Sequence, residues 1–189
     1  ILSACVSQET KVNSHQSNVH YNLALELAQN ALYQNSLDEF TKAISLDPNN
    51  MNAYRKKGLV HFGLRQYDEA EKLFVKAISL DPHNAQAHIN LGMVKYYTGD
   101  KVAAKSLWQK SVNLKTDDND SKALNNIANL YKEDKNYKKA TEYYLLAKNQ
   151  DSGNTMYLNN LADTLRLQGE LEQANLILKN SLKLNPRGV

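Results

Sequence analysis

Cysteine, proline and glycine are all scarce in this chain. Among its 189 residues there are one cysteine, three prolines and seven glycines. A single cysteine excludes an intrachain disulfide bond. No run of about 20 apolar residues occurs, so the sequence offers no ordinary transmembrane helix. Because helix breakers are few and no alternation of apolar and polar residues is sustained, the sequence predicts an all-α protein.

The charges do not indicate nucleic-acid binding. The net charge is +3, and the basic residues are interspersed with acidic ones. The densest basic cluster, Arg55-Lys56-Lys57, is interpreted as a solvated helix face. A nucleic-acid-binding protein concentrates its basic residues on one face or stripe. We therefore expect no nucleic-acid partner.

The motifs of common catalytic and cofactor sites are missing from the sequence. It contains no glycine-rich phosphate loop, no H-E-x-x-H, no G-x-S-x-G and no Cys–His pairing at metal-ligand spacing. His61, His83 and His88 are scattered over a helix-like run, a turn and the next helix-like run. We expect no catalytic residue, no metal site and no cofactor.

A repeated turn organises the chain. The sequence Asp47-Pro48-Asn49-Asn50 recurs 34 positions later as Asp81-Pro82-His83-Asn84. Between the two turns, residues 51–64 and 67–80 read as two helices. Small residues stand where these helices would approach closely, namely Gly58, Ala70 and Ala77. This pattern resembles the tetratricopeptide repeat, a helix–turn–helix unit of about 34 residues.

The resemblance implies a solenoid of five repeats, wound as a right-handed superhelix over residues 17–189. Back-counting from the turns gives repeats 17–50, 51–84, 85–120, 121–154 and 155–188. The marker alanines Ala70, Ala104, Ala140 and Ala174 follow one another at intervals of 34, 36 and 34 positions, so two residues are inserted before Ser121. A turn can absorb such an insertion at little cost.

The inserted turn is acidic. Asp117, Asp118 and Asp120 could suggest a calcium loop, but the downstream glycine and bidentate glutamate that such a loop needs are absent. We interpret these residues as helix caps.

The first helix of each repeat lines the concave groove in this family. Its sixth residue is asparagine in four of five repeats, forming what we call the amide row: Asn22, Lys56, Asn90, Asn126 and Asn160. Asparagine is common in this chain, but its recurrence in one register resembles the asparagine ladder of some tetratricopeptide arrays, including that of the O-linked N-acetylglucosamine transferase family. A primary amide both donates and accepts, so the row could pair with peptide groups of an extended ligand.

Neighbouring positions give the predicted groove two different halves. Apolar residues flank the row toward the N-terminus, namely Leu25, Leu59, Met93 and Tyr97, although several aromatic residues there could belong to the core. Amides flank it toward the C-terminus, namely Asn125 and Asn129. The lysine, asparagine and arginine set that captures C-terminal carboxylates in chaperone-binding members is incomplete, so that binding mode is disfavoured.

The first residues resemble a lipoprotein signal. Leu2-Ser3-Ala4-Cys5 is similar to the lipobox of bacterial lipoproteins, in which Cys5 would carry the lipid; an ordinary cysteine in a fragment is the alternative. Val6 after the cysteine is typical of outer-membrane lipoproteins. The polar residues 6–17 suggest a disordered tether, so residues 1–16 are predicted to be a lipobox remnant and flexible tether.

These resemblances together suggest a non-catalytic scaffold that binds proteins. The chain looks most like the lipoproteins of pilus assembly, of the Tad/Flp type or the PilF/PilW type. It would face the periplasm from the outer membrane, held by its lipid alone, and bind a secretin or another assembly subunit. Alternatives are a cytoplasmic adaptor or co-chaperone, and an adaptor for cell-wall enzymes. Leu176, Ile177, Leu182 and Leu184 lack a capping helix, so the native chain continues, a partner covers that edge, or the chain self-associates through it.

Overall fold

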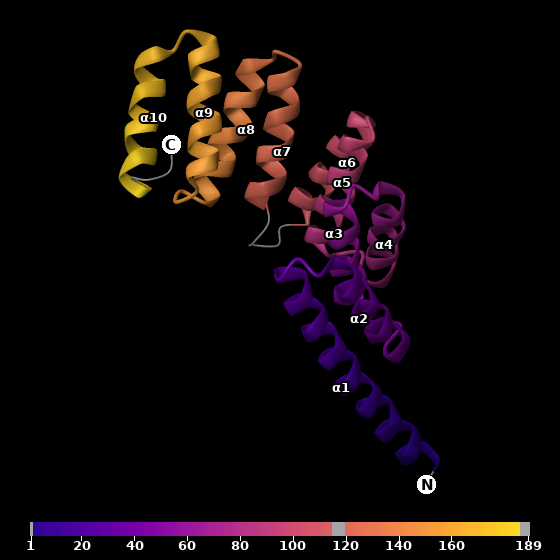
Figure 1. Ribbon diagram of the computed structural model, residues 1–189. Coiled ribbons are helices and arrows are strands. Elements are labelled where there is room, and N and C mark those ends of the chain that lie inside the picture. Colours follow the sequence, from indigo (N-terminus) through magenta and orange to yellow (C-terminus); the bar gives the residue numbers. More distant parts are fainter. Residues whose placement is uncertain (1, 115–119, 186–189) are drawn as a thin grey trace. The chain divides into compact units, whose positions relative to one another are not determined.

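The chain folds into helices throughout the parts that the structure describes. A computed structural model describes the backbone of residues 2–114 and 120–185, with side chains from residue 13 onward. Helices follow one another along these ranges, and no strand interrupts them (Figure 1). Their bounds are α1 Leu2–Gln29, α2 Tyr33–Leu46, α3 Met51–Gly63, α4 Tyr67–Leu80, α5 Ala85–Tyr97, α6 Lys101–Asn113, α7 Asp120–Glu133, α8 Tyr137–Gln150, α9 Thr155–Gln168 and α10 Leu171–Leu184. The all-α prediction is confirmed.

Each odd-numbered helix ends in a tight turn that leads into its even-numbered partner. One residue in each of these turns has a positive φ: Ala31 (60°), Arg65 (59°), Gly99 (93°), Lys135 (57°) and Gly169 (84°). The left-handed conformation stops a helix and reverses the chain, and it is easiest for glycine. These turns recur at intervals of 34, 34, 36 and 34 positions, so the backbone follows the period of the sequence, including the two inserted residues.

The turns between pairs are closed by side chains of the repeated sequence motif. In the first, the Asp47 carboxylate accepts a hydrogen bond from the N–H of Asn49 at 3.0 Å. Asn50 caps α3 by accepting from the N–H of Ala53, also at 3.0 Å. The turn at residues 81–84 makes both bonds again, at 3.0 and 2.9 Å. The motif therefore ends one helix and caps the next.

The helices are grouped into two compact units, Ile1–Val94 and Lys95–Val189, and the boundary lies within α5. The sequence predicts one continuous repeat domain over residues 17–189. Buried small residues let the paired helices approach closely in both units. In the first unit they surround Phe40, forming a cluster of Ala24, Phe40, Ala43 and Ala53. In the second they surround Tyr144, in a cluster of Ala128, Ala140, Tyr144, Leu161, Leu165 and Ala174.

The N-terminal segment differs from the predicted tether. Helix α1 begins at Leu2, so residues 6–17 are helical, and in Figure 1 α1 continues well past the end of α2. No proline or glycine occurs between residues 2 and 29, so nothing interrupts the local hydrogen bonds of the helix. Among the described side chains of α1, the first buried one is that of Ser17, which donates to the carbonyl of Ala43 at 2.8 Å.

Two sequence-based predictions lie outside the described residues. The side chain of Cys5, the predicted lipidation site, belongs to the N-terminal residues whose side chains are not described. Asp117 and Asp118, interpreted as helix caps, lie in the undescribed stretch 115–119, after which α7 begins at Asp120.

Candidate functional site

The first unit has an apolar pocket between its first two odd-numbered helices. Three predicted groove residues, Leu25 of α1 and Lys56 and Leu59 of α3, lie in its wall together with Phe40 and Val60. The pocket has a volume of about 340 Å³. That volume is at the lower end of the range typical of small-ligand sites, and it suits one large apolar side chain. Packing has thus brought Leu25 and Leu59, 34 positions apart, into one cavity.

The amide row is not equally accessible within the first unit. Asn22 is exposed, Lys56 is half-buried and Asn90 is only 3% exposed. Gln86, one turn earlier on α5, donates to Asn90 Oδ1 at 2.9 Å. Asn90 Nδ2 is buried and has no hydrogen-bond partner among the residues that the structure describes.

Two further predicted groove residues, Met93 and Tyr97, lie on α5 on either side of the unit boundary. Met93 is half-buried, whereas Tyr97 is 57% exposed. The ring of Tyr97 packs edge-on against Tyr96, with centroids 5.4 Å apart. Tyr96 also contacts Trp108 and donates a short hydrogen bond to Glu133, which raises the pKa of the Tyr96 hydroxyl to about 12. The exposed Tyr97 ring therefore packs against Tyr96, whose own position is fixed by its contacts with Trp108 and Glu133.

The amide-rich half lies on α7 and α9 of the second unit. Asn160 Nδ2 donates to Asn125 Oδ1 at 3.0 Å, so amides of successive repeats are linked directly. Asn125 is buried, and Asn129 accepts a hydrogen bond from the buried hydroxyl of Tyr144. Asn126 is half-buried and makes no side-chain hydrogen bond among the described residues. Asn126 is therefore the member of this group best placed to meet a ligand.

An ion-pair network on the same helices was not predicted from the sequence. Lys132 Nζ lies 2.5 Å from Asp163, and Arg166 Nη2 lies 2.8 Å from the other carboxylate oxygen. Hydrogen bonds from Lys132 and then Arg166 lower the pKa of Asp163 despite some opposing desolvation. The i, i+3 spacing of Asp163 and Arg166 is a signal that sequence analysis could have used. The link from Asp163 to Lys132, in the preceding repeat, required the packing of α7 on α9.

A second cavity, between α6 and α7, was also missed. It measures about 730 Å³, and its wall includes Lys101, Val102, Lys105 and Tyr131. The ammonium of Lys105 lies 4.2 Å from the Tyr131 ring centroid and donates to its hydroxyl at 2.6 Å. The available sequence signal is the longer spacing between the third and fourth repeats, since the inserted residues fall between these two helices.

Within the described residues, no cluster of three or more His, Cys, Asp or Glu side chains is suited to a metal ion. No helix in those residues is both long and apolar enough to cross a membrane.

Family models match three stretches of the chain. Tetratricopeptide-repeat models match residues 17–50 and 52–84. A model described as YpiA-like, C-terminal tetratricopeptide repeats, matches residues 123–188. Together these stretches span more than two thirds of the chain. No curated protein sequence matches it.

Solved structures share the fold at low sequence identity. PilW, described as a widely conserved type IV pilus biogenesis factor, has a TM-score of 0.79 and 21% identity over 89% of this chain and 77% of PilW. PilF of Pseudomonas aeruginosa has a TM-score of 0.76 and 21% identity over 92% and 78% of the two chains. YrrB, described as a tetratricopeptide protein with an unusual peptide-binding site, has a TM-score of 0.62 and 22% identity over 89% and 86%.

These comparisons agree with the features of the chain itself. The recurring left-handed turns, the buried marker alanines and the capped inter-repeat turns are those of stacked helix–turn–helix units, an architecture that forms extended surfaces for binding other proteins. The chain is a member of the tetratricopeptide-repeat family, and it resembles PilF and PilW.

Proposed function

We propose that this protein is a non-catalytic scaffold of five repeats that binds an extended peptide or partner subunit along its odd-numbered helices. The observation that carries the proposal is the pocket formed by Leu25 and Leu59 beside Lys56 of the amide row. An extended chain could place one apolar side chain in this pocket and pair its peptide groups with nearby amides. Such a role requires no catalytic group.

We further propose that the scaffold is a lipoprotein of the outer membrane, facing the periplasm, that assists assembly of a pilus or secretion machine. Two independent features support this. Leu2-Ser3-Ala4-Cys5 has the lipobox pattern. PilF and PilW have the same fold, and PilW is described as a pilus biogenesis factor. The expected partners are subunits of such a machine, a secretin among them. The proposed machine is a type IV pilus or a Tad/Flp pilus, and the identity of the captured subunits distinguishes the two.

Groove binding can be separated from folding by substitution. Alanine at Leu59, Met93 or Asn126 should weaken capture of partners while changing the free energy of unfolding by less than about 1 kcal/mol. Ala70→Leu should do the reverse, because Ala70 is fully buried and overpacking costs about 1–3 kcal/mol. Capture is measured by affinity purification and mass spectrometry from the cells that produce the protein. Equal loss of stability in all four variants would contradict the groove assignment.

The membrane assignment has its own test. Cells fed an alkyne-labelled palmitate should attach label to the wild-type protein, and Cys5→Ser should abolish the label. A wild-type protein that acquires no lipid would favour the cytoplasmic adaptor or co-chaperone. A labelled protein that captures peptidoglycan enzymes rather than pilus subunits would favour the cell-wall adaptor.

A further inference from the structure

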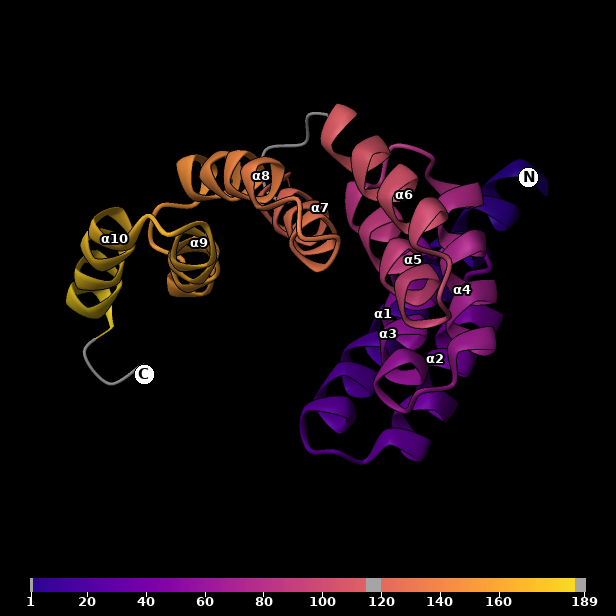
Figure 2. The ribbon, with the colours of Figure 1, turned by 90° about the horizontal axis from the view of Figure 1, so that it is seen from above.

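The last described helix, α10, exposes positions that the earlier even-numbered helices bury. The eighth residue of each even-numbered helix is large and apolar or aromatic, namely Phe40, Phe74, Trp108, Tyr144 and Leu178. The first four are at most 3% exposed, whereas Leu178 is 41% exposed. Leu182, one turn further along α10, is 44% exposed, although its counterparts Ile44 and Ile78 are half-buried. Helix α9 packs along one side of α10 (Figure 1 and Figure 2), and no helix of the described residues follows α10 to cover these leucines.

Helix α1 exposes the complementary positions. The third residue of each predicted repeat is apolar or aromatic, namely Val19, Ala53, Ala87, Ala123 and Tyr157. The last four are at most 1% exposed, whereas Val19 is 54% exposed. Leu23, one turn later on α1, is also exposed, although three of its four counterparts are buried, namely Leu91, Ile127 and Leu161. No even-numbered helix precedes α1 in the part of the chain that the structure describes.

The interfaces between inner repeats show how such surfaces pack. Ala53 of α3 belongs to one core cluster with Phe40 and Ala43 of α2. Tyr157 of α9 belongs to one core cluster with Ala147 of α8. In both cases an odd-numbered helix covers the preceding even-numbered helix with the third residue of its repeat, and burial of apolar surface stabilises the contact.

The two terminal helices have the registers that such a contact requires. Counted by the period of the sequence, Val19 of α1 corresponds to Ala53, and Leu178 of α10 corresponds to Phe40. Packing α1 of one copy on α10 of another would bury Val19 against Leu178 and cover Leu182, as one repeat covers the next inside the chain. A second copy therefore supplies the kind of helix that each exposed surface lacks.

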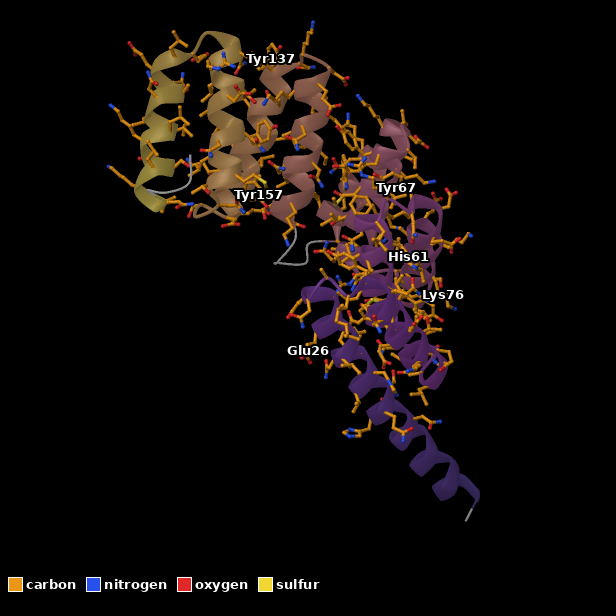
Figure 3. All side chains as sticks on the ribbon, viewed as in Figure 1. Glu26, His61, Tyr67, Lys76, Tyr137 and Tyr157 are labelled. Atoms are coloured by element: carbon orange, nitrogen blue, oxygen red, sulfur yellow. The ribbon has the colours of Figure 1, made fainter. Side chains whose placement is uncertain are left out.

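Opposite charges would meet beside the apolar residues of this contact. The Lys57 ammonium of α3 donates to Thr41 of α2 at 2.8 Å, which shows how the two helices align. By the same period Lys57 corresponds to Leu23, and Thr41 corresponds to Lys179. Lys179 would therefore lie beside Leu23 of the next copy, one turn from Glu26. Glu26 is exposed and projects from α1 (Figure 3), so the two charges could form an ion pair across the contact.

Glu26 also makes the contact selective. Its counterparts in the third and fourth repeats, Val94 and Leu130, are buried, so a helix that covers α1 in the same way would cover Glu26 as well. Covering a carboxylate is unfavourable unless a cation accompanies it. Lys179 provides that cation on α10. The chain's own α10 is thus a better cover for α1 than an apolar helix without a lysine at this position.

We propose that copies of this chain associate head to tail, with α1 of one copy packed on α10 of the next as α3 packs on α2 and α9 on α8. The two surfaces differ, so the interface is heterologous and leads to rings or filaments rather than to a symmetric dimer. The inference goes beyond the proposed function and does not depend on it, because Val19, Leu178 and Leu182 lie outside the pocket of Leu25 and Leu59.

The test measures the mass of the full chain by sedimentation velocity at increasing protein concentration. A reducing agent is present, because a disulfide bond between two copies of Cys5 would give a dimer by another route. Val19→Asp blocks the α1 surface, and Leu182→Asp blocks the α10 surface. The control is Leu176→Asp. Leu176 is 61% exposed on α10, but its counterparts in the other repeats are exposed and polar, namely Asp38, Lys72, Ser106 and Glu142.

Wild type and Leu176→Asp are expected to form species larger than a dimer as the concentration rises. Val19→Asp and Leu182→Asp should each remain monomeric. An equimolar mixture of these two variants should form a one-to-one complex and stop there, because one variant retains the α10 surface and the other retains the α1 surface. Recovery of association in the mixture also shows that both variants are folded.

The ion pair has a test that leaves the apolar residues unchanged. Glu26→Lys or Lys179→Glu should weaken association about tenfold or more, because each places like charges opposite one another. The variant with both substitutions should recover most of the loss, because the opposite charges are restored with their places exchanged.

Three outcomes would overturn the inference. Wild type that stays monomeric at every concentration would refute self-association. A dimer that forms despite Val19→Asp but not with Leu182→Asp would indicate a symmetric contact between two α10 helices. An equal loss of association in Leu176→Asp would indicate unspecific adhesion of apolar surface. The proposed groove would stand in each case, because Leu25 and Leu59 are unchanged in all of these variants.

Discussion

Gly58 is the position where a single methyl group should disturb the fold most measurably. A Cβ added there would lie 2.7 Å from Cε1, 3.0 Å from Cδ1 and 3.1 Å from Cζ of Phe74. The Phe74 ring is fully buried, so it cannot swing into solvent to make room. Overpacking of this kind costs about 1–3 kcal/mol. Alanine in place of a helical glycine returns about 0.5–1 kcal/mol. We expect Gly58→Ala to lower the free energy of unfolding by about 1–2 kcal/mol.

The same helix provides a matched control. Gly63 also lies on α3, but a Cβ added there meets no heavy atom within 4 Å. Gly63→Ala should therefore be neutral or stabilising by up to about 1 kcal/mol. Urea denaturation followed by far-ultraviolet circular dichroism compares the two variants with wild type. If Gly58→Ala were as stable as Gly63→Ala, the ring must relax freely and the reasoning would be refuted.

A double-mutant cycle identifies the clash as the cause. Phe74→Leu removes the ring atoms that crowd the added methyl group. The penalty of Gly58→Ala should therefore be smaller in the Phe74→Leu background, giving a coupling energy of about 0.5 kcal/mol or more. Additive effects would instead place the cost of Gly58→Ala elsewhere.

Three further predictions concern a turn, an ion pair and the last helix. Arg65 has a φ of 59°, so Arg65→Gly should stabilise the protein by about 1 kcal/mol in denaturation experiments, and a destabilised variant would contradict this. Hydrogen bonds from Lys132 and Arg166 lower the pKa of Asp163. The stability that Asp163 contributes to the fold is therefore present above its unfolded-state pKa and is lost as the pH falls through its folded-state pKa. Because the side chain is 41% exposed, Asp163→Asn should cost less than about 1 kcal/mol at neutral pH and nothing in strong acid; an undiminished cost in acid would refute the pairing. Five leucines of α10 are at least 41% exposed, so amides in Leu171–Leu184 should exchange faster than those in Tyr67–Leu80, and equal protection in a demonstrated monomer would overturn that expectation.

The helices and turns of each repeat could be predicted from the sequence. The recurring Asp-Pro-x-Asn turn and the small residues at fixed places predicted paired helices, and the family comparisons and the structure confirm the all-α tetratricopeptide fold. Such features are local. The Asp47 carboxylate accepts a hydrogen bond from the backbone N–H two residues later, and the capping amide of Asn50 accepts one from the backbone N–H three residues later. Interactions of that range depend only on neighbouring residues, so the sequence contains them. The tether shows the opposite case, since polar composition favoured disorder while the absence of helix breakers allowed α1 to extend to Leu2.

The burial of side chains between helices, and their pairing across helices, could not be inferred in that way. The amide row was chosen by register alone, yet Asn22 is exposed, Asn90 is buried and Asn125 is bonded to Asn160. The register determines which face of a helix a residue occupies, whereas burial and pairing depend on the rotation and separation of its neighbours. The repeat, its period and the two extra residues in the leading turn of the fourth repeat could all be read from the amino-acid sequence. The shared pocket of Leu25 and Leu59 could be recognised only from the folded chain, because side chains 34 positions apart meet through the packing of α1 on α3.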